Sequence, residues 1–156
     1  MKKAEPQKEH QWLQKLVGDW TFEAEMGGSS KSSGTERVRS LGGLWILAEG
    51  QGEMPGGGMA NVLMTLGFDP AKKRYTGTWI GSMMTHLWIY DGQMDASGRV
   101  LTLTAQGPSM AGDGTTATYQ DIIEIESDDH RILRSRVLTE SGEWKEFMTA
   151  HFRRKP

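Results

Sequence analysis

Histidines and carboxylates are the side chains of this chain that could carry acid–base or metal chemistry. The chain has four histidines and no cysteine, which excludes disulfides, thiolate metal ligands and a cysteine nucleophile. His10 falls in a helical segment and His130 beside a turn, so both are expected at the surface. His86 and His151 fall in separate strands and lack the His-Glu-x-x-His spacing of a helical metal site. Neither a metal site nor a cofactor is predicted.

Glu49 and Glu53 are the carboxylates best placed to act as a general acid and base. Glu49 shares a strand face with Trp45, however, and a carboxylate beside an aromatic ring is commonly an ordinary ion-pair partner. No catalytic residue is therefore predicted. The alternative is an enzyme that uses a polar pair inside the fold, with His86, His151 or Glu49 among its members.

Ten methionines and six tryptophans in 156 residues are the most unusual feature of the composition. Large rings and flexible thioethers around a few polar groups are typical of a pocket for a flat or flexible apolar ligand, but they also fill the interiors of small barrels. A cavity above roughly 300 Å³ would favour binding, and a smaller one a structural role. The residues predicted to bind a ligand are Trp45, Met64, Trp79, Met84, His86, Trp88, Tyr90 and Met148. His86 and Tyr90 would orient the ligand through hydrogen bonds.

The elements that must position these residues are one helix and a series of short strands. Pro6 suits a first helical turn, apolar residues gather on one side up to Leu16, and Gly18 follows, which predicts a helix over about residues 6–17. Alternating apolar and polar residues between turn signals then predict ten strands. They cover residues 19–26, 35–41, 44–52, 61–68, 74–80, 85–90, 100–106, 115–126, 131–139 and 143–153. Because no second helix is long enough for a crossover, the sheet must be antiparallel.

A meander of about ten strands can bury its apolar face in a sandwich or in a barrel, and closure into a barrel removes the exposed edges. Gly18-Asp19-Trp20 directly after the helix has the Gly-x-Trp form that starts the first strand of lipocalin-like barrels. In those barrels a basic residue near the end of the last strand lies over the tryptophan, a place that Arg153 or Arg154 could take. We expect an all-β domain over residues 1–156, an antiparallel meander closed into a lipocalin-like barrel with one short N-terminal helix.

Several stretches resemble the bacterial domain-of-unknown-function family 1579, most specifically between Leu66 and Leu103. They include Leu66-Gly67-Phe68-Asp69, Thr78-Trp79-Ile80 and Leu101-Thr102-Leu103. The similarity covers nearly the whole chain and implies a small β-barrel of the lipocalin or calycin kind. That family has no established activity, so the resemblance supplies no site residue.

Charge and hydropathy limit the partners. Eighteen basic and twenty acidic residues give a net charge of −2, which argues against binding to nucleic acid or an anionic membrane. Without the apolar stretch of a signal peptide or a membrane span, a cytoplasmic location is expected. The arginines toward the C-terminus lie close in sequence to glutamates, which predicts a solvated face; they are Arg131, Arg134, Arg136, Arg153 and Arg154. Segments 29–33, 54–59 and 107–114 are expected to be loops, the last two at the mouth of the barrel. A small apolar ligand is the expected partner, and self-association into a homo-oligomer is the alternative.

Overall fold

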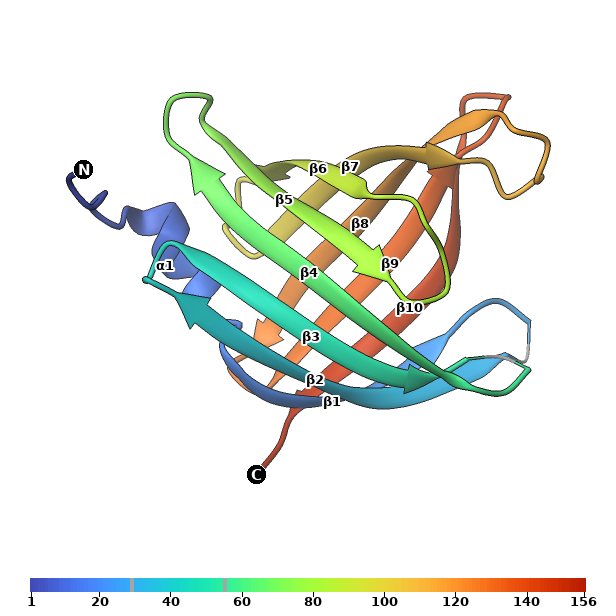
Figure 1. The fold of residues 1–156 in the computed structure, drawn as a ribbon, viewed down its shortest axis with the longest axis horizontal. Coiled ribbons are helices and arrows are strands. Elements are labelled where there is room, and N and C mark those ends of the chain that lie inside the picture. The colour runs from blue at the N-terminus through green and yellow to red at the C-terminus, as the bar shows by residue number, and fades with distance from the viewer. Residues whose placement is uncertain (29, 55) are drawn as a thin grey trace.

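The chain forms a closed barrel of antiparallel strands in the computed structural model, which describes residues 1–28, 30–54 and 56–156 (Figure 1). Ser29 and Pro55, both in predicted loops, lie outside the described residues. The elements are α1 (Lys8–Gln14), β1 (Gly18–Glu25), β2 (Lys31–Leu41), β3 (Trp45–Glu53), β4 (Met59–Asp69), β5 (Arg74–Gly81), β6 (Trp88–Met94), β7 (Val100–Pro108), β8 (Thr116–Ser127), β9 (His130–Leu138) and β10 (Trp144–Arg154).

Each strand pairs with its neighbour in sequence, and β1 closes the sheet by pairing with β10. The predicted all-β meander and its closure into a barrel are therefore confirmed. The helix is shorter than predicted, and β2 starts at Lys31 rather than at residue 35. The first residues of β2 are polar or glycine and show no apolar alternation, but they pair with β1 from Ser32 to Gly34. Pairing with the adjacent strand outweighs the weak local signal.

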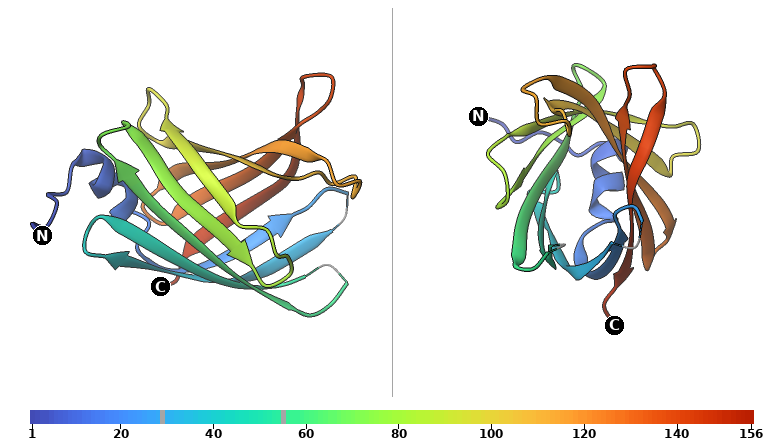
Figure 2. Two further views of the ribbon diagram at one scale, coloured as in Figure 1. Left: turned by 45° about the horizontal axis from the view of Figure 1, so that its top comes forward. Right: turned by 90° about the vertical axis from the view of Figure 1, so that its right-hand side faces the viewer.

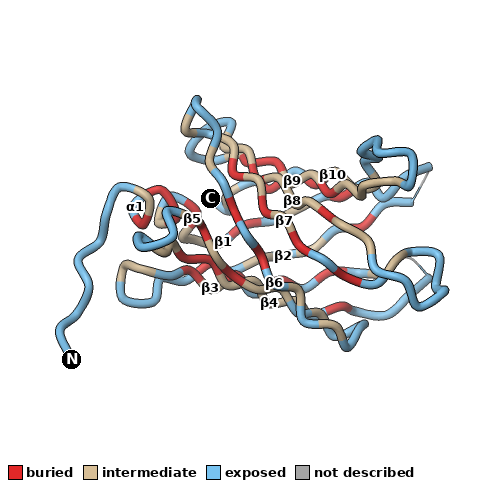
Figure 3. Tube along the Cα trace, turned by 90° about the horizontal axis from the view of Figure 1, so that it is seen from above, coloured by how far each residue is buried: buried red, intermediate tan, exposed pale blue. Residues whose placement is uncertain are grey.

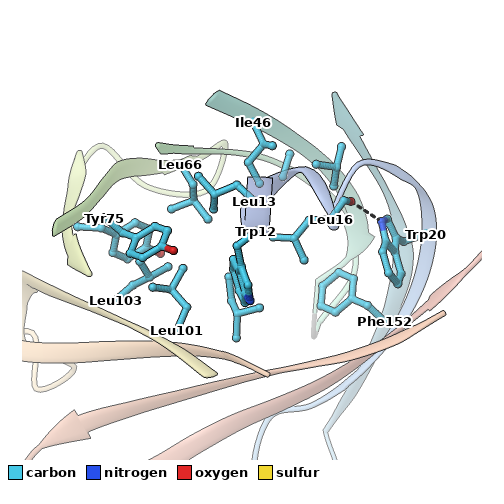
Figure 4. Packing of buried hydrophobic residues seen from close by; sticks show 14 of the residues in the cluster. Trp12, Leu13, Leu16, Trp20, Ile46, Leu66, Tyr75, Leu101, Leu103 and Phe152 are labelled. Carbon is cyan, nitrogen blue, oxygen red and sulfur yellow. Dashed lines mark hydrogen bonds between the residues drawn. The ribbon is translucent and has the colours of Figure 1, made fainter. Parts of the chain in front are cut away.

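Helix α1 lies across one end of the barrel, and Figure 2 shows it behind the ring of strands when the opposite end faces the viewer. Its apolar side chains Trp12 and Leu13, and Leu16 just after it, are buried in the barrel (Figure 4). The Trp12 indole N–H donates to the Gly98 carbonyl at 2.7 Å, which ties the helix to the β6–β7 turn. Among the described residues, no helix combines the length and the apolar character needed to cross a membrane.

His10 belongs to this helix and its side chain is buried, so the expectation that it lies at the surface was wrong. Its Nδ1 accepts from the Gln7 backbone N–H at 2.9 Å, and its Nε2 donates to the Phe68 carbonyl at 3.0 Å. Both ring nitrogens are thus satisfied inside the protein, which is what makes burial of an imidazole tolerable. His10 joins the helix to β4.

Trp20 is the buried centre of the closed end, with only 1% of its surface exposed. Its indole N–H donates to the Leu16 carbonyl at 2.9 Å (Figure 4). The Arg154 guanidinium lies 4.3 Å from its ring centre, which confirms the predicted basic residue over the tryptophan. Arg131 lies 4.7 Å from the same ring and 4.1 Å from the ring of Phe152.

Arg131 was expected on a solvated face, and that expectation was wrong. Its side chain is 6% exposed and forms an ion pair with Glu36, which is 13% exposed. Burial lowers the pKa of Arg131 and the Glu36 carboxylate opposes this effect. Strand alternation turns Arg131 inward with Leu133 and Ser135, and a buried charge needs a partner of this kind.

Candidate ligand-binding site

The inward face of the barrel is packed near α1 and accessible near the opposite end. Toward the helix, Ile46, Leu66, Leu101, Leu103 and Ile123 are at most 2% exposed. Toward the other end, the inward-facing side chains Val62, Trp79, Trp88, Val137 and Met148 are only half-buried. We call these two regions the closed half and the open half. Figure 3 shows buried positions along the strands and near α1, and exposed loops at both ends of the barrel.

Four rings form an aromatic arc around the open half: His86, Trp88, Tyr119 and Phe147. The ring of Trp88 packs edge-on against His86 at 4.6 Å and against Tyr119 at 5.0 Å, and Tyr119 packs against Phe147 at 6.2 Å between ring centres. The Trp88 indole N–H donates to the Met84 sulfur at 3.1 Å, and the Tyr119 hydroxyl donates to the Pro108 carbonyl at 2.5 Å. The polar atoms of these rings are thus satisfied at the rim, while their apolar surfaces line the barrel.

Gly107 on β7 leaves room for the Trp88 ring of the aromatic arc to lie against this strand. A Cβ atom at this position would lie 2.1 Å from the Trp88 ring, so only a glycine allows the indole to lie over β7. The β6–β7 ladder runs only from Asp91–Thr104 to Met94–Leu101. Beyond it, the His86 Nε2 donates to the Gln106 carbonyl at 3.0 Å. In this part of the wall, a side chain from the β5–β6 connection is hydrogen-bonded to β7 where the β6–β7 backbone pairing has ended.

A polar cluster of Tyr90, Asp121 and Ser135 lies inside the barrel next to the arc. The Tyr90 hydroxyl donates to Asp121 Oδ2, and the Ser135 hydroxyl donates to Asp121 Oδ1 at 2.6 Å. Burial raises the pKa of Asp121, and the two hydroxyl donors only partly offset that effect. Burial and the adjacent Asp121 carboxylate raise the pKa of Tyr90 well above its usual range.

A β-bulge in β10 changes which side chains face inward at the open half. The register with β9 shifts between Glu146 and Met148, and one strand residue is left unpaired. Strict alternation along residues 143–153 would place Met148 and Trp144 on the same face, but the structure places them on opposite faces. Met148 points inward with Ala150, whereas Trp144 lies outside with the Arg136 guanidinium 4.7 Å from its ring centre. The bulge is the physical reason, because an extra residue inverts the alternation.

Most of the residues predicted to bind a ligand gather in or beside the open half. Those on strands that point inward are Met64, Trp79, Trp88, Tyr90 and Met148. Met84 and His86 lie at the rim, on the connection between β5 and β6. Met64 also lines the small cavity of the closed half, so the structure brings six of the eight to the open half or its rim, and their role in binding stays a prediction.

Trp45 lies on the outer surface, so its expected place in the lumen was wrong. It is 40% exposed and covers Gly67, where a Cβ atom would lie 2.4 Å from its ring. Alternation explains this, because the adjacent Ile46 faces the interior. Glu49 is also outside, paired with Arg39.

The residues proposed for the enzyme alternative do not converge. His151 lies on the outer surface, where its ring stacks on His130 at 5.2 Å between ring centres. Glu49 is outside as well, and only His86 lies at the rim of the barrel. Within residues 1–28, 30–54 and 56–156, no group of three or more His, Asp or Glu side chains is arranged to hold a metal ion.

The closed half holds a cavity of about 20 Å³ beside the Glu36–Arg131 pair. Its walls include Leu16, Met64 and Ile123. This volume is enough for about one water molecule and far below the size of a ligand pocket. By the criterion set from the sequence, a cavity of this size favours a structural role, and the closed half is therefore a packed core.

Tyr119, Phe147 and Asp121 were not among the residues predicted from the sequence. Asp121 had a readable signal, because it interrupts an inward series of Tyr119, Ile123 and Ile125 in which every second residue is apolar. A carboxylate at such a position predicts a buried polar contact. The contribution of Phe147 had no such signal, because it depends on the bulge.

A family model described as "Protein of unknown function (DUF1579)" matches residues 5–154. The chain belongs to this family. No curated protein matches it. Among solved structures, a redesigned β-barrel, b11L5F_LGL, is 10% identical with a TM-score of 0.52, covering 98% of this chain and 100% of the other.

Two further designed proteins share the fold of this DUF1579 member. A fluorescence-activating β-barrel designed de novo is 15% identical with a TM-score of 0.51, and the match covers 91% of this chain and 95% of that one. EF1p2_mFAP2b, in a structure bound to DFHBI, is 11% identical with a TM-score of 0.53, covering 94% and 99%. At these identities the similarity concerns the fold alone.

Proposed function

We propose that this DUF1579 protein binds a small, flat apolar or aromatic molecule in the open half of its barrel, without catalysing a reaction. The observation that carries the proposal is the contrast in burial along one continuous inward face. Inward side chains such as Leu66 and Leu101 are fully buried near α1, whereas Trp79, Trp88 and Met148 are half-buried, although Tyr119 beside Trp88 is only 8% exposed. Large inward-facing apolar surface that is left accessible to solvent is what a ligand would cover.

The chemistry of the open half supports the same proposal. Ring faces and methionine sulfurs supply dispersion contacts that tolerate different ligand shapes. The Asp121 cluster adds a few fixed polar atoms, the usual complement of such sites. One of the designed barrels with this fold, EF1p2_mFAP2b, was solved bound to DFHBI, so a small ligand is compatible with the architecture. The lipocalin or calycin relationship, the cytoplasmic location and the bacterial source stay predictions from the sequence.

The proposal is tested by titration with N-phenyl-1-naphthylamine, a neutral aromatic probe that fluoresces in apolar surroundings. We expect saturable binding to one site, with quenching of tryptophan fluorescence. Val137→Trp, which adds a ring to the inward face of the open half, should weaken binding at least tenfold. Ile89→Trp is the matched control, because Ile89 is on the outer face and 62% exposed, and it should bind like the unmodified protein.

Two outcomes would overturn the proposal: no saturable binding, or equal affinity in the Val137→Trp variant. Native mass spectrometry of protein purified without detergent provides a second measurement. A bound species above the mass of the bare chain, reduced in Val137→Trp and retained in Ile89→Trp, is the expected result.

A further inference from the structure

Asp121 is an inward-facing acid without a cationic partner in the part of the chain that the structure describes. Its two hydrogen-bond partners, Tyr90 and Ser135, are neutral hydroxyls. The other carboxylate inside the barrel, Glu36, is neutralised by Arg131. Among the buried side chains that the structure describes, the Glu36–Arg131 pair in the closed half is thus balanced, and the Asp121 carboxyl group between the two halves is not. Burial without a counter-charge also accounts for the raised pKa of Asp121.

The carboxyl group of Asp121 has unused hydrogen-bonding capacity. Each of its oxygens accepts one hydrogen bond from the protein, whereas a carboxylate offers about four acceptor positions. Tyr90 and Ser135 hold the group in place from strands on either side of β8. Acceptor positions on both oxygens are therefore left for a further donor.

The aromatic arc lies directly on the open side of this carboxyl group. Tyr119 is two residues from Asp121 on the same face of β8, and Trp88 is two residues from Tyr90 on the same face of β6. The rings of Trp88 and Tyr119 are 5.0 Å apart. A flat molecule that packs against these rings would therefore have one end directed toward Asp121.

We propose that Asp121 is the polar anchor of the site and that the ligand is an aromatic or apolar amine, whose protonated nitrogen pairs with the Asp121 carboxylate. This inference rests on the proposed function and specifies its ligand class. A protonated amine supplies both the missing donor and the missing charge. A carboxylic acid of the same shape would instead place two negative charges side by side.

Three probes of one shape and different charge test the inference: 1-naphthylmethylamine, 1-naphthylmethanol and 1-naphthoate. Each is measured at pH 7 by its ability to displace N-phenyl-1-naphthylamine. We expect the amine to bind at least tenfold more tightly than the alcohol, and the carboxylate to bind most weakly. Asp121→Asn should reduce the advantage of the amine over the alcohol to less than threefold.

Asp91→Asn is the matched control, because Asp91 is an exposed aspartate on the outer side of β6. It should keep the full preference for the amine. Ser135→Ala retains the charge at Asp121 and should also keep most of the preference. If Asp121→Asn does not fold, the ratio of amine to alcohol in the unmodified protein still decides the question.

The possible failures are distinguishable. Equal binding of amine and alcohol by the unmodified protein, or an unchanged preference in Asp121→Asn, would overturn the role of Asp121 and leave the proposed function standing. Absence of binding by all three probes and by N-phenyl-1-naphthylamine would overturn both.

Discussion

The closed and open halves of the barrel use the same strands but differ in how their interior is filled. In the closed half, α1 inserts apolar side chains between the strands, and Trp20 is enclosed by two arginines. In the open half, none of the described residues forms a helix that enters the barrel, and rings such as Trp88 line the wall with part of their surface accessible. Burial in this barrel therefore depends on the element that closes the end, because the same strands alternate through both halves apart from the bulge in β10.

Breaking the buried Glu36–Arg131 ion pair of the closed half should cause the largest loss in the free energy of unfolding. Arg131→Met leaves Glu36 without a partner and should cost about 3–5 kcal/mol in the free energy of unfolding. Adding Glu36→Leu should recover most of this loss, because no buried charge is then left unpaired. Urea denaturation measures both variants. A double variant as unstable as Arg131→Met would contradict the explanation.

The outer pair Arg39–Glu49 is the control for this comparison. Both side chains are more than half exposed, and pairs of this kind contribute about 0–1 kcal/mol. Arg39→Met should therefore change the midpoint of urea denaturation only slightly.

Removing one tryptophan from each half compares the packing directly. Trp20→Ala deletes a ring that is 1% exposed and should cost about 3–5 kcal/mol. Trp88→Ala removes a half-buried ring and should cost about 1–2 kcal/mol, because less apolar area returns to water. Thermal unfolding followed by circular dichroism measures both. Equal losses would show that the open half is packed as tightly as the closed half.

The pH dependence of stability tests the unbalanced carboxyl group. Since the pKa of Asp121 is raised in the folded protein, the folded state binds more protons than the unfolded state above about pH 4, the usual range of the group. The contribution of Asp121 to stability is therefore most favourable at low pH and falls as pH rises through its folded pKa, by at most about 1.4 kcal/mol per pH unit.

Asp121→Asn should remove this slope. The free energy of unfolding is measured by urea denaturation between pH 4 and pH 8. As pH rises, the variant should become more stable relative to the unmodified protein. The free energy of unfolding of Asp91→Asn, a change on the outer surface, should depend on pH as that of the unmodified protein does. A constant difference for Asp121→Asn across this range would count against the raised pKa.

The smallest effect is expected on the outer surface. Trp45→Ala removes a ring that is 40% exposed and covers Gly67, so it should cost about 1 kcal/mol or less. It should leave the affinity for N-phenyl-1-naphthylamine unchanged. A large loss of affinity would place the site on the outer face and would contradict the assignment to the open half.

Much of the fold was predictable because the signals are local. The Gly-x-Trp segment ending at Trp20 and the terminal Arg154 predicted a contact that the barrel contains at 4.3 Å. Alternation placed Trp79, Trp88 and Tyr90 on faces that the structure turns inward. Arg131 was mistaken for a surface residue because charge in sequence predicts exposure, and only its pairing with Glu36, 95 residues away, makes burial tolerable.

The candidate site was less predictable, for a physical reason that Asp121 and Phe147 illustrate. Asp121 on β8 accepts a hydrogen bond from Tyr90, which lies 31 residues away on β6, and these two strands are not neighbours in the sheet. No spacing along the chain therefore indicates the pair. Phe147 joins the arc only because a bulge shifts β10 by one residue. Neither feature follows from the period of two that identified the strands.

The amino-acid sequence by itself determined the helix, the strands, the turns and the antiparallel order, because side-chain alternation and turn residues act over a few neighbouring positions. The tertiary structure alone decided which faces point inward and which charges are paired. It also decided that one end of the barrel is filled while the other stays accessible. These outcomes depend on contacts between strands far apart in sequence and on where α1 is inserted, and a local pattern carries no information about either.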